Sequence, residues 1–202
     1  MNKRGLLLVV SGPSGAGKGT ICAELLSKHP EIFLSVSATT RAPREGEVDG
    51  KNYFFMTEEE FTSKIDRKGF IEWACFCGNY YGTPKDVVEE KLENGQDVIL
   101  EIEVQGAMKV KSEYPEAVFI FVVPPTAEIL RERLTGRGTE TEEVISKRLE
   151  TAKWEFSNVT KYNYILINDE VSLAVSRLES ILCAEKARVA RNGTFIESYS
   201  LN

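Results

Sequence analysis

The sequence predicts an α/β fold in which helices flank a mostly parallel sheet. Residues 6–10 form a continuous apolar run, which is typical of a parallel strand buried on both faces, and residues 98–104 and 118–123 read as two more apolar strands. Segments with helical spacing of apolar residues separate these runs, and alternating strands and helices predict an α/β sheet. The 202 residues suffice for one sizeable core with attached lobes.

The N-terminal part should begin with the strand at residues 6–10, followed by a glycine-rich turn. A helix through Ile21 and Leu25 is expected next. It should end before Pro30, because the residue that precedes a proline avoids the helical region. Residues 33–37 are expected to form a second strand.

The segment from about residue 40 to 77 differs in composition, since basic, turn-forming and aromatic residues replace the long apolar runs. Short aromatic strands are expected at residues 53–55 and 70–76. Thr57 and Glu60 have the spacing of a capping box, which predicts the start of a helix between these two strands.

A further helix should begin with Thr83 as its N-cap and Pro84 at its first helical position. Gly95 should end this helix, because glycine is the usual residue just beyond a helix C-terminus. After the two remaining apolar strands, Thr126 should open another helix, which the glycines of residues 136–138 interrupt.

The last part of the chain is predicted to be mostly helical. Thr139 and Glu142 have the spacing of a second capping box, and a charged helix should run from there to about Trp154. Residues 162–167 are expected to form the last strand, and residues 171–191 the last helix.

These elements divide the chain into three parts. The predicted core comprises residues 1–37, 94–125 and 157–202, which contain all the long apolar strands. Residues 38–93 are expected to form an inserted lobe of mixed character, and residues 126–156 a polar helical flap.

The composition excludes several classes of protein. The net charge of −6 and the isoelectric point near 5.1 argue against a dedicated nucleic-acid-binding protein, which usually carries a basic face. The apolar run near the N-terminus is too short to span a membrane, and no cleavage site follows it. The cysteines lack the usual zinc spacing, so we expect reduced thiols in a cytoplasmic protein. These residues are Cys22, Cys75, Cys77 and Cys183, with His29 as the single histidine.

Residues 12–20 are glycine-rich and lie between the first strand and the first helix, which is the setting of a phosphate-binding P-loop. The glycines allow successive N–H groups to point at phosphate oxygens, and the helix N-terminus adds partial positive charge. The lysine of such a loop reaches the β- and γ-phosphates. The predicted ATP-binding residues here are Gly12, Pro13, Ser14, Gly15, Ala16, Gly17, Lys18, Gly19 and Thr20.

The loop departs from the standard pattern at one position. A serine or threonine usually follows the lysine and reaches Mg²⁺, whereas here Gly19 follows Lys18 and Thr20 comes next. Direct coordination by a hydroxyl directly after Lys18 is therefore excluded. We expect Mg²⁺ to accompany ATP and to be held mainly by phosphates and water, since this ion dehydrates reluctantly.

A second cluster of anion-binding residue types follows in residues 37–53 (SATTRAPREGEVDGKNY). Arg41 and Arg44 are three residues apart and Tyr53 follows them, and arginine forks match phosphate oxygens. Taken alone, this segment could equally be a solvated basic loop.

This segment and several later ones, in the same order, resemble the guanylate kinase family, which implies a P-loop nucleoside-monophosphate kinase fold. The resemblance extends over about residues 5–185. The matching segments are residues 37–53, 70–73 (FIEW), 78–83 (GNYYGT), 101–106 (EIEVQG), 136–142 (GRGTETE) and 147–149 (KRL).

The resemblance makes residues 38–93 a GMP-binding lobe and residues 126–156 a lid. It implies that Arg41, Arg44, Tyr53 and Tyr81 bind the GMP phosphate. It also implies that Ser37, Glu72, Thr83 and Glu101 bind the guanine. The family often has serine at position 83 and aspartate at position 101, so Glu101 differs from the pattern in length, and Glu103 is an alternative for the magnesium water shell.

The chemistry of guanine supports the role of Glu72 independently. The Watson–Crick edge of guanine offers N1–H and an exocyclic NH₂ side by side, and one carboxylate can accept from both. Adenine has an unprotonated N1 at that place and would be repelled. Without the resemblance, Glu72 could also be a solvent-facing glutamate of a strand.

Four arginines surround the glycine-flanked break in the flap. The resemblance implies that Arg137 and Arg148 reach the transferring phosphoryl group together with Lys18 and Arg41, and that Arg133 binds ATP. Arg131 is the fourth. Asn168 and Asp169 follow the last strand and are similar to the adenine pocket of the family. A pair of charged helices with surface ion pairs is the alternative.

The predicted activity is transfer of the γ-phosphoryl group of ATP to GMP, giving ADP and GDP, in purine nucleotide metabolism. No general base is needed, because the attacking phosphate oxygen is already anionic. Three other functions are compatible with parts of this pattern: another nucleoside-monophosphate kinase, a protein-interaction module of the same fold, and a nucleotide-binding regulator without turnover. The intact loop at residues 12–20 argues against an interaction module.

Overall fold

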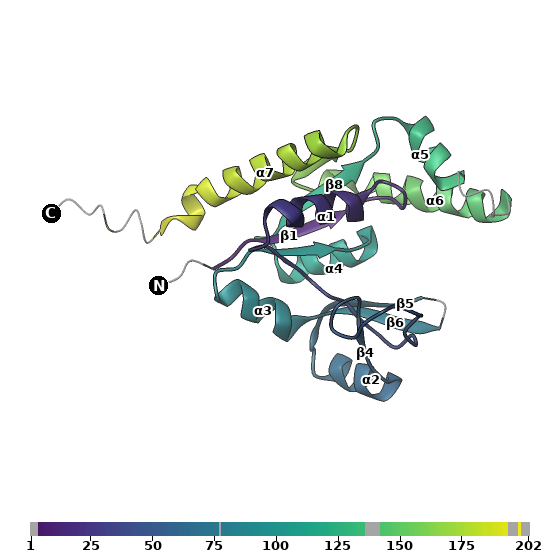
Figure 1. The fold of residues 1–202 in the computed structure, drawn as a ribbon, viewed down its shortest axis with the longest axis horizontal. Coiled ribbons are helices and arrows are strands. Elements are labelled where there is room, and N and C mark those ends of the chain that lie inside the picture. The colour runs from purple at the N-terminus through teal and green to yellow at the C-terminus, as the bar shows by residue number, and fades with distance from the viewer. Residues whose placement is uncertain (1–3, 77, 136–141, 194–197, 199–202) are drawn as a thin grey trace.

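A computed structural model describes residues 4–76, 78–135, 142–193 and 198, and its core is a five-stranded sheet. The strands have the order β2-β7-β1-β8-β9, and every neighbouring pair is parallel. The sheet therefore agrees with the predicted parallel core (Figure 1). Its strands are β1 (Leu7–Ser11), β2 (Phe33–Leu34), β7 (Val98–Glu101), β8 (Val118–Val123) and β9 (Tyr164–Ile167).

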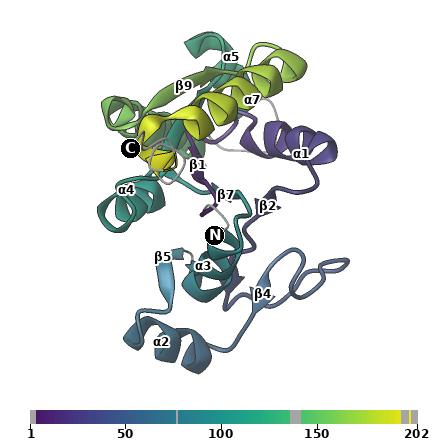
Figure 2. The ribbon, with the colours of Figure 1, turned by 90° about the vertical axis from the view of Figure 1, so that its left-hand side faces the viewer.

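Helices cover both faces of this sheet, because alternate residues of its buried strands point to opposite sides. Leu8 and Val10 pack with residues of α1 (Lys18–Lys28) and α7 (Val171–Ala187). Leu7 and Val9 pack with residues of the helices α3 and α4 on the other face. Figure 2 shows α1 and α4 on opposite sides of β1. The bounds of the second pair of helices are Lys85–Glu93 for α3 and Val104–Glu113 for α4.

A second sheet with the order β4-β3-β6-β5 lies beside the core. Phe61 of the helix α2 is fully buried in its small core and stacks on Phe70, with ring centroids 4.2 Å apart. Helix α4 packs against β5 and so joins the inserted lobe to the core. The elements of this lobe are β3 (Ala38–Thr39), β4 (Phe54–Phe55), α2 (Glu58–Asp66), β5 (Phe70–Phe76) and β6 (Asn79–Pro84).

Two helices, α5 (Ala127–Thr135) and α6 (Glu142–Ser157), project from one end of the core (Figure 1). They share a small cluster of buried residues, in which Leu130 and Leu134 of α5 meet Ala152 of α6. Two short 3₁₀ helices complete the described chain, η1 (Val159–Lys161) and η2 (Val189–Arg191).

Several predicted elements are confirmed. The strands at Phe70–Phe76 and Val118–Val123 have the predicted bounds. The capping box is also present, since Thr57 Oγ1 accepts from the Glu60 N–H and the Glu60 carboxylate accepts from the Thr57 N–H. The predicted box at Thr139 lies outside the described residues.

Three expectations were wrong. Thr83 does not cap α3, because it belongs to β6 and its hydroxyl donates to Glu72, while Pro84 occupies the N-cap position. The predicted strand at residues 98–104 ends at Glu101, where α4 soon follows, and the sequence analysis missed both this helix and β6. The strand expected at residues 33–37 is only Phe33–Leu34.

Within the described part of the chain, no helix is long and apolar enough to cross a bilayer. Cys22, Cys75 and Cys183 are free thiols, and Cys77 lies outside the described residues.

Candidate functional site

The glycine-rich loop between β1 and α1 has the backbone geometry of a phosphate cradle. Gly12, Gly15 and Gly17 have φ angles of 143°, 80° and 89°, which residues with a side chain rarely adopt. Gly12 also approaches the neighbouring strand so closely that a Cβ there would lie 2.2 Å from the Val122 carbonyl oxygen. The loop leads directly into α1, whose N-terminal N–H groups favour an anion.

The Lys18 side chain folds back onto this loop. Its ammonium donates to the carbonyl oxygens of Gly12 at 2.7 Å and Pro13 at 3.2 Å. Burial lowers the pKa of Lys18, and the nearby carboxylates of Glu101 and Glu155 oppose that shift. A phosphate group would supply the negative charge that a half-buried ammonium requires.

Residues from two distant elements also contact the loop. Asn168, which follows β9 and is 4% exposed, donates from Nδ2 to the Ala16 carbonyl oxygen at 2.8 Å. Arg133 of α5 donates to the Gly15 carbonyl oxygen at 3.4 Å. The structure therefore brings together these two predicted ATP-binding residues and the loop. Asp169 instead forms an ion pair with Arg177 at 2.7 Å.

Glu101 lies at the carboxyl end of β7, next to the phosphate cradle. A Cβ on Gly19 would be 3.5 Å from its Oε1 atom, and its charge acts on Lys18. Glu103 is the N-cap residue of α4 and also acts on Lys18. Among the described residues, no group of three His, Cys, Asp or Glu side chains could hold a metal ion.

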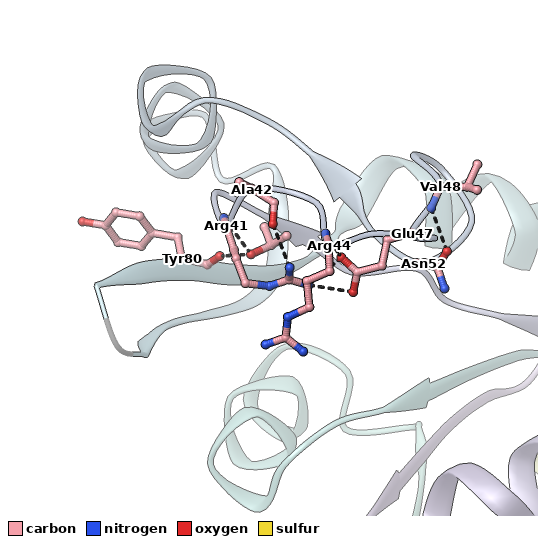
Figure 3. A network of polar contacts seen from close by, with 8 residues as sticks. Arg41, Ala42, Arg44, Glu47, Val48, Asn52 and Tyr80 are labelled. Atoms are coloured by element: carbon pink, nitrogen blue, oxygen red, sulfur yellow. Dashed lines mark hydrogen bonds and ion pairs between the residues drawn. The ribbon is translucent and has the colours of Figure 1, made fainter.

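The basic loop of the inserted lobe is a second set of cationic groups (Figure 3). Arg41 donates from Nη2 to both carboxylate oxygens of Glu47, at 2.9 and 3.0 Å, and from Nη1 to the Ala42 carbonyl oxygen at 2.7 Å. The Arg44 side chain is exposed, and Figure 3 shows its guanidinium pointing away from Glu47. Thr39 Oγ1 accepts from the Arg41 N–H at 3.2 Å and so ties the loop to the sheet.

Aromatic rings form one wall beside Arg41. The guanidinium carbon lies 5.4 Å from the ring centroid of Tyr53 and 5.9 Å from that of Phe55. Tyr53 meets Tyr81 edge to face, with centroids 6.1 Å apart, and the Tyr81 hydroxyl interacts with Arg41. The structure thus brings together Arg41 and both tyrosines predicted to bind a phosphate.

Glu72 and Thr83 form the polar pair of the inserted lobe. They face each other across β5 and β6, and the fully buried Thr83 hydroxyl donates to Glu72 Oε1 at 2.8 Å. Burial raises the pKa of Glu72, whereas the hydrogen bond from Thr83 opposes that shift. The other oxygen, Oε2, lies 3.0 Å from the place that a Cβ on Gly106 of α4 would take. The carboxylate is therefore oriented by Thr83 and lies against the backbone of α4.

The remaining predicted residues are less closely grouped. Ser37 is half-buried at the junction of the two sheets, and its carbonyl oxygen accepts from the Phe54 N–H at 2.9 Å. Arg148 is half-buried on α6, and Arg131 is exposed on α5. Arg137 lies outside the described residues.

Sequence analysis missed two carboxylates. Glu47 is one of many acidic residues in a polar segment, and nothing in its spacing marks it as the partner of Arg41. Glu155 of α6 is 6% exposed, and its charge acts on Lys18 about 140 residues away along the chain, counted from their numbers. Its neighbours Trp154 and Phe156 are both exposed, so the local sequence carries no signal of its burial.

A family profile and full-length relatives both show similarity of this chain to guanylate kinases. The family profile described as guanylate kinase matches residues 4–185. A guanylate kinase from Caldanaerobacter subterraneus is 57% identical over 192 residues, covering 95% of this chain and 93% of that protein. One from Desulfitobacterium hafniense is 58% identical over 187 residues, covering 93% and 94%.

Solved structures of related kinases are also similar to this chain. The crystal structure of a guanylate kinase from Anaplasma phagocytophilum has a TM-score of 0.74 at 35% identity, covering 94% of this chain and 90% of that one. A shikimate kinase from Bacteroides thetaiotaomicron has a TM-score of 0.51 at 16% identity, covering 88% and 98%, which is a likeness of fold alone.

Proposed function

This chain belongs to the guanylate kinase family, and we propose how its own residues transfer the γ-phosphoryl group of ATP to GMP. One observation carries the proposal: two clusters of groups suited to bind anions, of different construction, lie beside the two sheets. The core sheet carries a backbone cradle with Lys18, and the inserted sheet carries a basic loop beside the Glu72–Thr83 pair.

The cradle is proposed to bind ATP. Its N–H groups and the N-terminus of α1 would receive the phosphates, and Lys18 would exchange its carbonyl partners for phosphate oxygens. Arg133 and Asn168 hold the loop from two other elements, which supports their assignment to the ATP site. The residues proposed to form this site are Gly12, Pro13, Ser14, Gly15, Ala16, Gly17, Lys18, Gly19, Thr20, Arg133 and Asn168.

The inserted lobe is proposed to bind GMP. Arg41, Arg44 and the hydroxyls of Tyr53 and Tyr81 would bind its phosphate, because these donors lie on one loop and one aromatic wall. Glu72 would accept from the two guanine donors. Its Oε1 already accepts from Thr83, so this hydroxyl orients the carboxylate, and Ser37 lies at the adjoining junction of the sheets.

The proposed mechanism depends on position and charge. The attacking GMP oxygen is anionic and needs no general base, so catalysis requires alignment of two phosphates and stabilisation of the charge between them. Lys18 would act from the cradle and Arg41 from the basic loop. Arg148 on α6, together with Arg137, is proposed to complete the set when the helical segment at residues 126–156 acts as a lid that excludes water.

Magnesium is proposed as the accompanying cation. When bound, Mg²⁺ would neutralise part of the negative charge of the ATP phosphates. The site fits an ion held mainly by phosphates and water, because Glu101 and Glu103 offer carboxylate oxygens beside Lys18 that could accept from such water. The position of Glu101 beside Gly19 favours this water shell over the guanine contact.

The proposal extends to the setting of the reaction. We place the enzyme in the cytoplasm and in purine nucleotide metabolism, with ATP and GMP as its small-molecule partners and no nucleic acid or membrane. The free thiols and the net charge of −6 support this setting.

A substrate panel tests the function. ADP release is measured with GMP, AMP, UMP and dTMP as acceptors, and we expect turnover with GMP to exceed that with the other three. Efficient turnover of another monophosphate would indicate a different kinase of this architecture. Absence of ADP release with all four would leave an interaction module or a regulator without turnover.

A further inference from the structure

Glu47 is the carboxylate in contact with the Arg41 guanidinium (Figure 3). Both of its oxygens accept from Arg41 Nη2, at 2.9 and 3.0 Å, and the two side chains are only 16% and 19% exposed. Most surface ion pairs join mobile, exposed side chains and contribute little. This pair differs because it is partly enclosed and is held by two hydrogen bonds.

The same carboxylate also closes the turn that carries both arginines. Glu47 Oε2 accepts from the Arg44 N–H at 2.7 Å, and the Glu47 N–H donates to the Arg44 carbonyl oxygen at 3.0 Å. One side chain therefore fixes the Arg41 guanidinium and the backbone of Arg44 together. The hydrogen bond from Arg41 is the main reason that the pKa of Glu47 is lowered, so the carboxylate is ionised at neutral pH.

We propose that Glu47 is a positioning residue for the phosphoryl acceptor: it holds Arg41 in the orientation that receives the phosphate of GMP. This inference rests on the proposed function of the inserted lobe. Glu47 acts through Arg41 and does not itself touch the substrate, since a carboxylate and a phosphate repel each other.

The donors of Arg41 support this role. A guanidinium has five N–H groups, and Arg41 uses those of Nη2 on Glu47 and one of Nη1 on the Ala42 carbonyl oxygen. The Nε–H and the second N–H of Nη1 are left for other acceptors, and the Tyr81 hydroxyl interacts with the same group. Because the guanidinium is rigid and planar, fixing one edge fixes the direction of the remaining donors.

Glu47 has two opposing effects on a bound phosphate, and they can be separated. Through Arg41 it favours binding, because an oriented fork loses less freedom when it binds. Through its own charge it disfavours binding, because two anions share the loop. Removal of the Glu47 charge should therefore weaken GMP binding when Arg41 is present and should not weaken it when Arg41 is absent.

The test compares Glu47→Gln in the wild-type background and in the Arg41→Met background. In the wild-type background we expect the KM for GMP to rise about tenfold, the size of one lost charge-assisted contact, with the KM for ATP within about twofold. In the Arg41→Met background, Glu47→Gln should leave the KM for GMP unchanged or lower it. Glu47→Asp keeps the charge and should give an intermediate KM.

Asp49→Asn is the matched control. Asp49 belongs to the same loop, and its Oδ1 accepts from the Phe55 N–H at 2.8 Å, a contact that asparagine can keep while losing the charge. We expect its KM for GMP to stay close to that of the wild type. Calorimetric titration of GMP and the melting temperature of each variant are measured in parallel, so that a loosened loop is not mistaken for a lost contact.

Three results would overturn the role of Glu47: an unchanged KM for GMP in Glu47→Gln, an equal rise in both backgrounds, or an equal rise in Asp49→Asn. Absence of GMP turnover by the wild-type enzyme is a different outcome, since it would remove the proposed function itself.

Discussion

Glu155 should make the stability of the protein depend on pH near neutrality. This glutamate lies on α6, is 6% exposed, and its charge acts on Lys18 and on Tyr162. Burial raises the pKa of Glu155 from 4.5 to about 7, while the charge of Lys18 opposes the shift and that of Glu103 adds to it. We therefore examine the variant Glu155→Gln, which has the same shape and cannot ionise.

The sign of the effect follows from proton linkage. Between pH 4.5 and about 7 the folded protein holds a proton on Glu155 that the unfolded chain has released, so stability falls as the pH rises through this window. The pKa of Glu155 rises from 4.5 in the unfolded chain to about 7 in the folded protein. At about 1.36 kcal/mol per pKa unit, this rise lowers the free energy of unfolding by about 3 kcal/mol once the pH exceeds both values. Glu155→Gln should thus gain about 3 kcal/mol relative to the wild type above pH 7, and nothing below pH 4.5.

The assay is urea unfolding of both proteins at several pH values from 4.5 to 8, with the difference in free energy of unfolding plotted against pH. Glu150→Gln is the control, because Glu150 is exposed on the same helix. The difference in free energy of unfolding between Glu150→Gln and the wild type should vary little across this pH range. A difference between Glu155→Gln and the wild type that stays constant with pH, or that shrinks above pH 6, would refute the reasoning. It would mean that Glu155 ionises at its ordinary pKa in the folded protein.

Three further predictions test the two sites. Lys18→Ala should lower kcat by on the order of 10²–10³, because it removes a positioned charge from the phosphates, while calorimetry should show GMP binding within about twofold of the wild type. Gly17→Ala should lower stability by about 1–3 kcal/mol in thermal unfolding and weaken ATP binding, since φ is 89° and the new Cβ would lie 2.2 Å from Asn168 Nδ2. Glu72→Gln should lower kcat/KM for GMP by an amount equivalent to about 2–4 kcal/mol of transition-state stabilisation, because one guanine donor would face an amide N–H. The preference for GMP over AMP should fall with it. An unchanged ratio of the two kcat/KM values would exclude Glu72 from base selection.

The fold was predictable where local pattern and burial agree. The run at Val118–Val123 is apolar throughout and lies at an inner position of a parallel sheet, so its composition alone fixes its type and bounds. The capping box at Thr57 is similarly local. Helix α4 was missed because its glycine and its modest helical periodicity directly follow a strong strand, and packing against β5 stabilises it.

The candidate site likewise has a part that is local in sequence and a part that distant elements bring together. The cradle at residues 12–20 is a contiguous motif whose glycines, strand and helix are all adjacent in sequence, so it could be predicted residue by residue. The Thr83–Pro84 pair favours a helix start by its local sequence, yet pairing of β6 with β5 places Thr83 opposite Glu72. The electrostatic effect of Glu155 on Lys18 and the hydrogen bond from Asn168 to Ala16 join distant elements, and no local pattern encodes them.

The two cations proposed to bind phosphate, Lys18 beside the core sheet and Arg41 beside the inserted sheet, share one electrostatic arrangement. Lys18 is half-buried near the carboxylate of Glu101, and Arg41 is held by Glu47. A cation taken partly out of water requires a counter-charge, so without nucleotide the neighbouring carboxylates fill that role. A bound phosphate would bring more negative charge than a carboxylate, and Glu47 would then orient Arg41 through its two hydrogen bonds instead of neutralising it. Both sites can therefore be built before substrate binds, which reduces the reorganisation needed when the two phosphates are brought together.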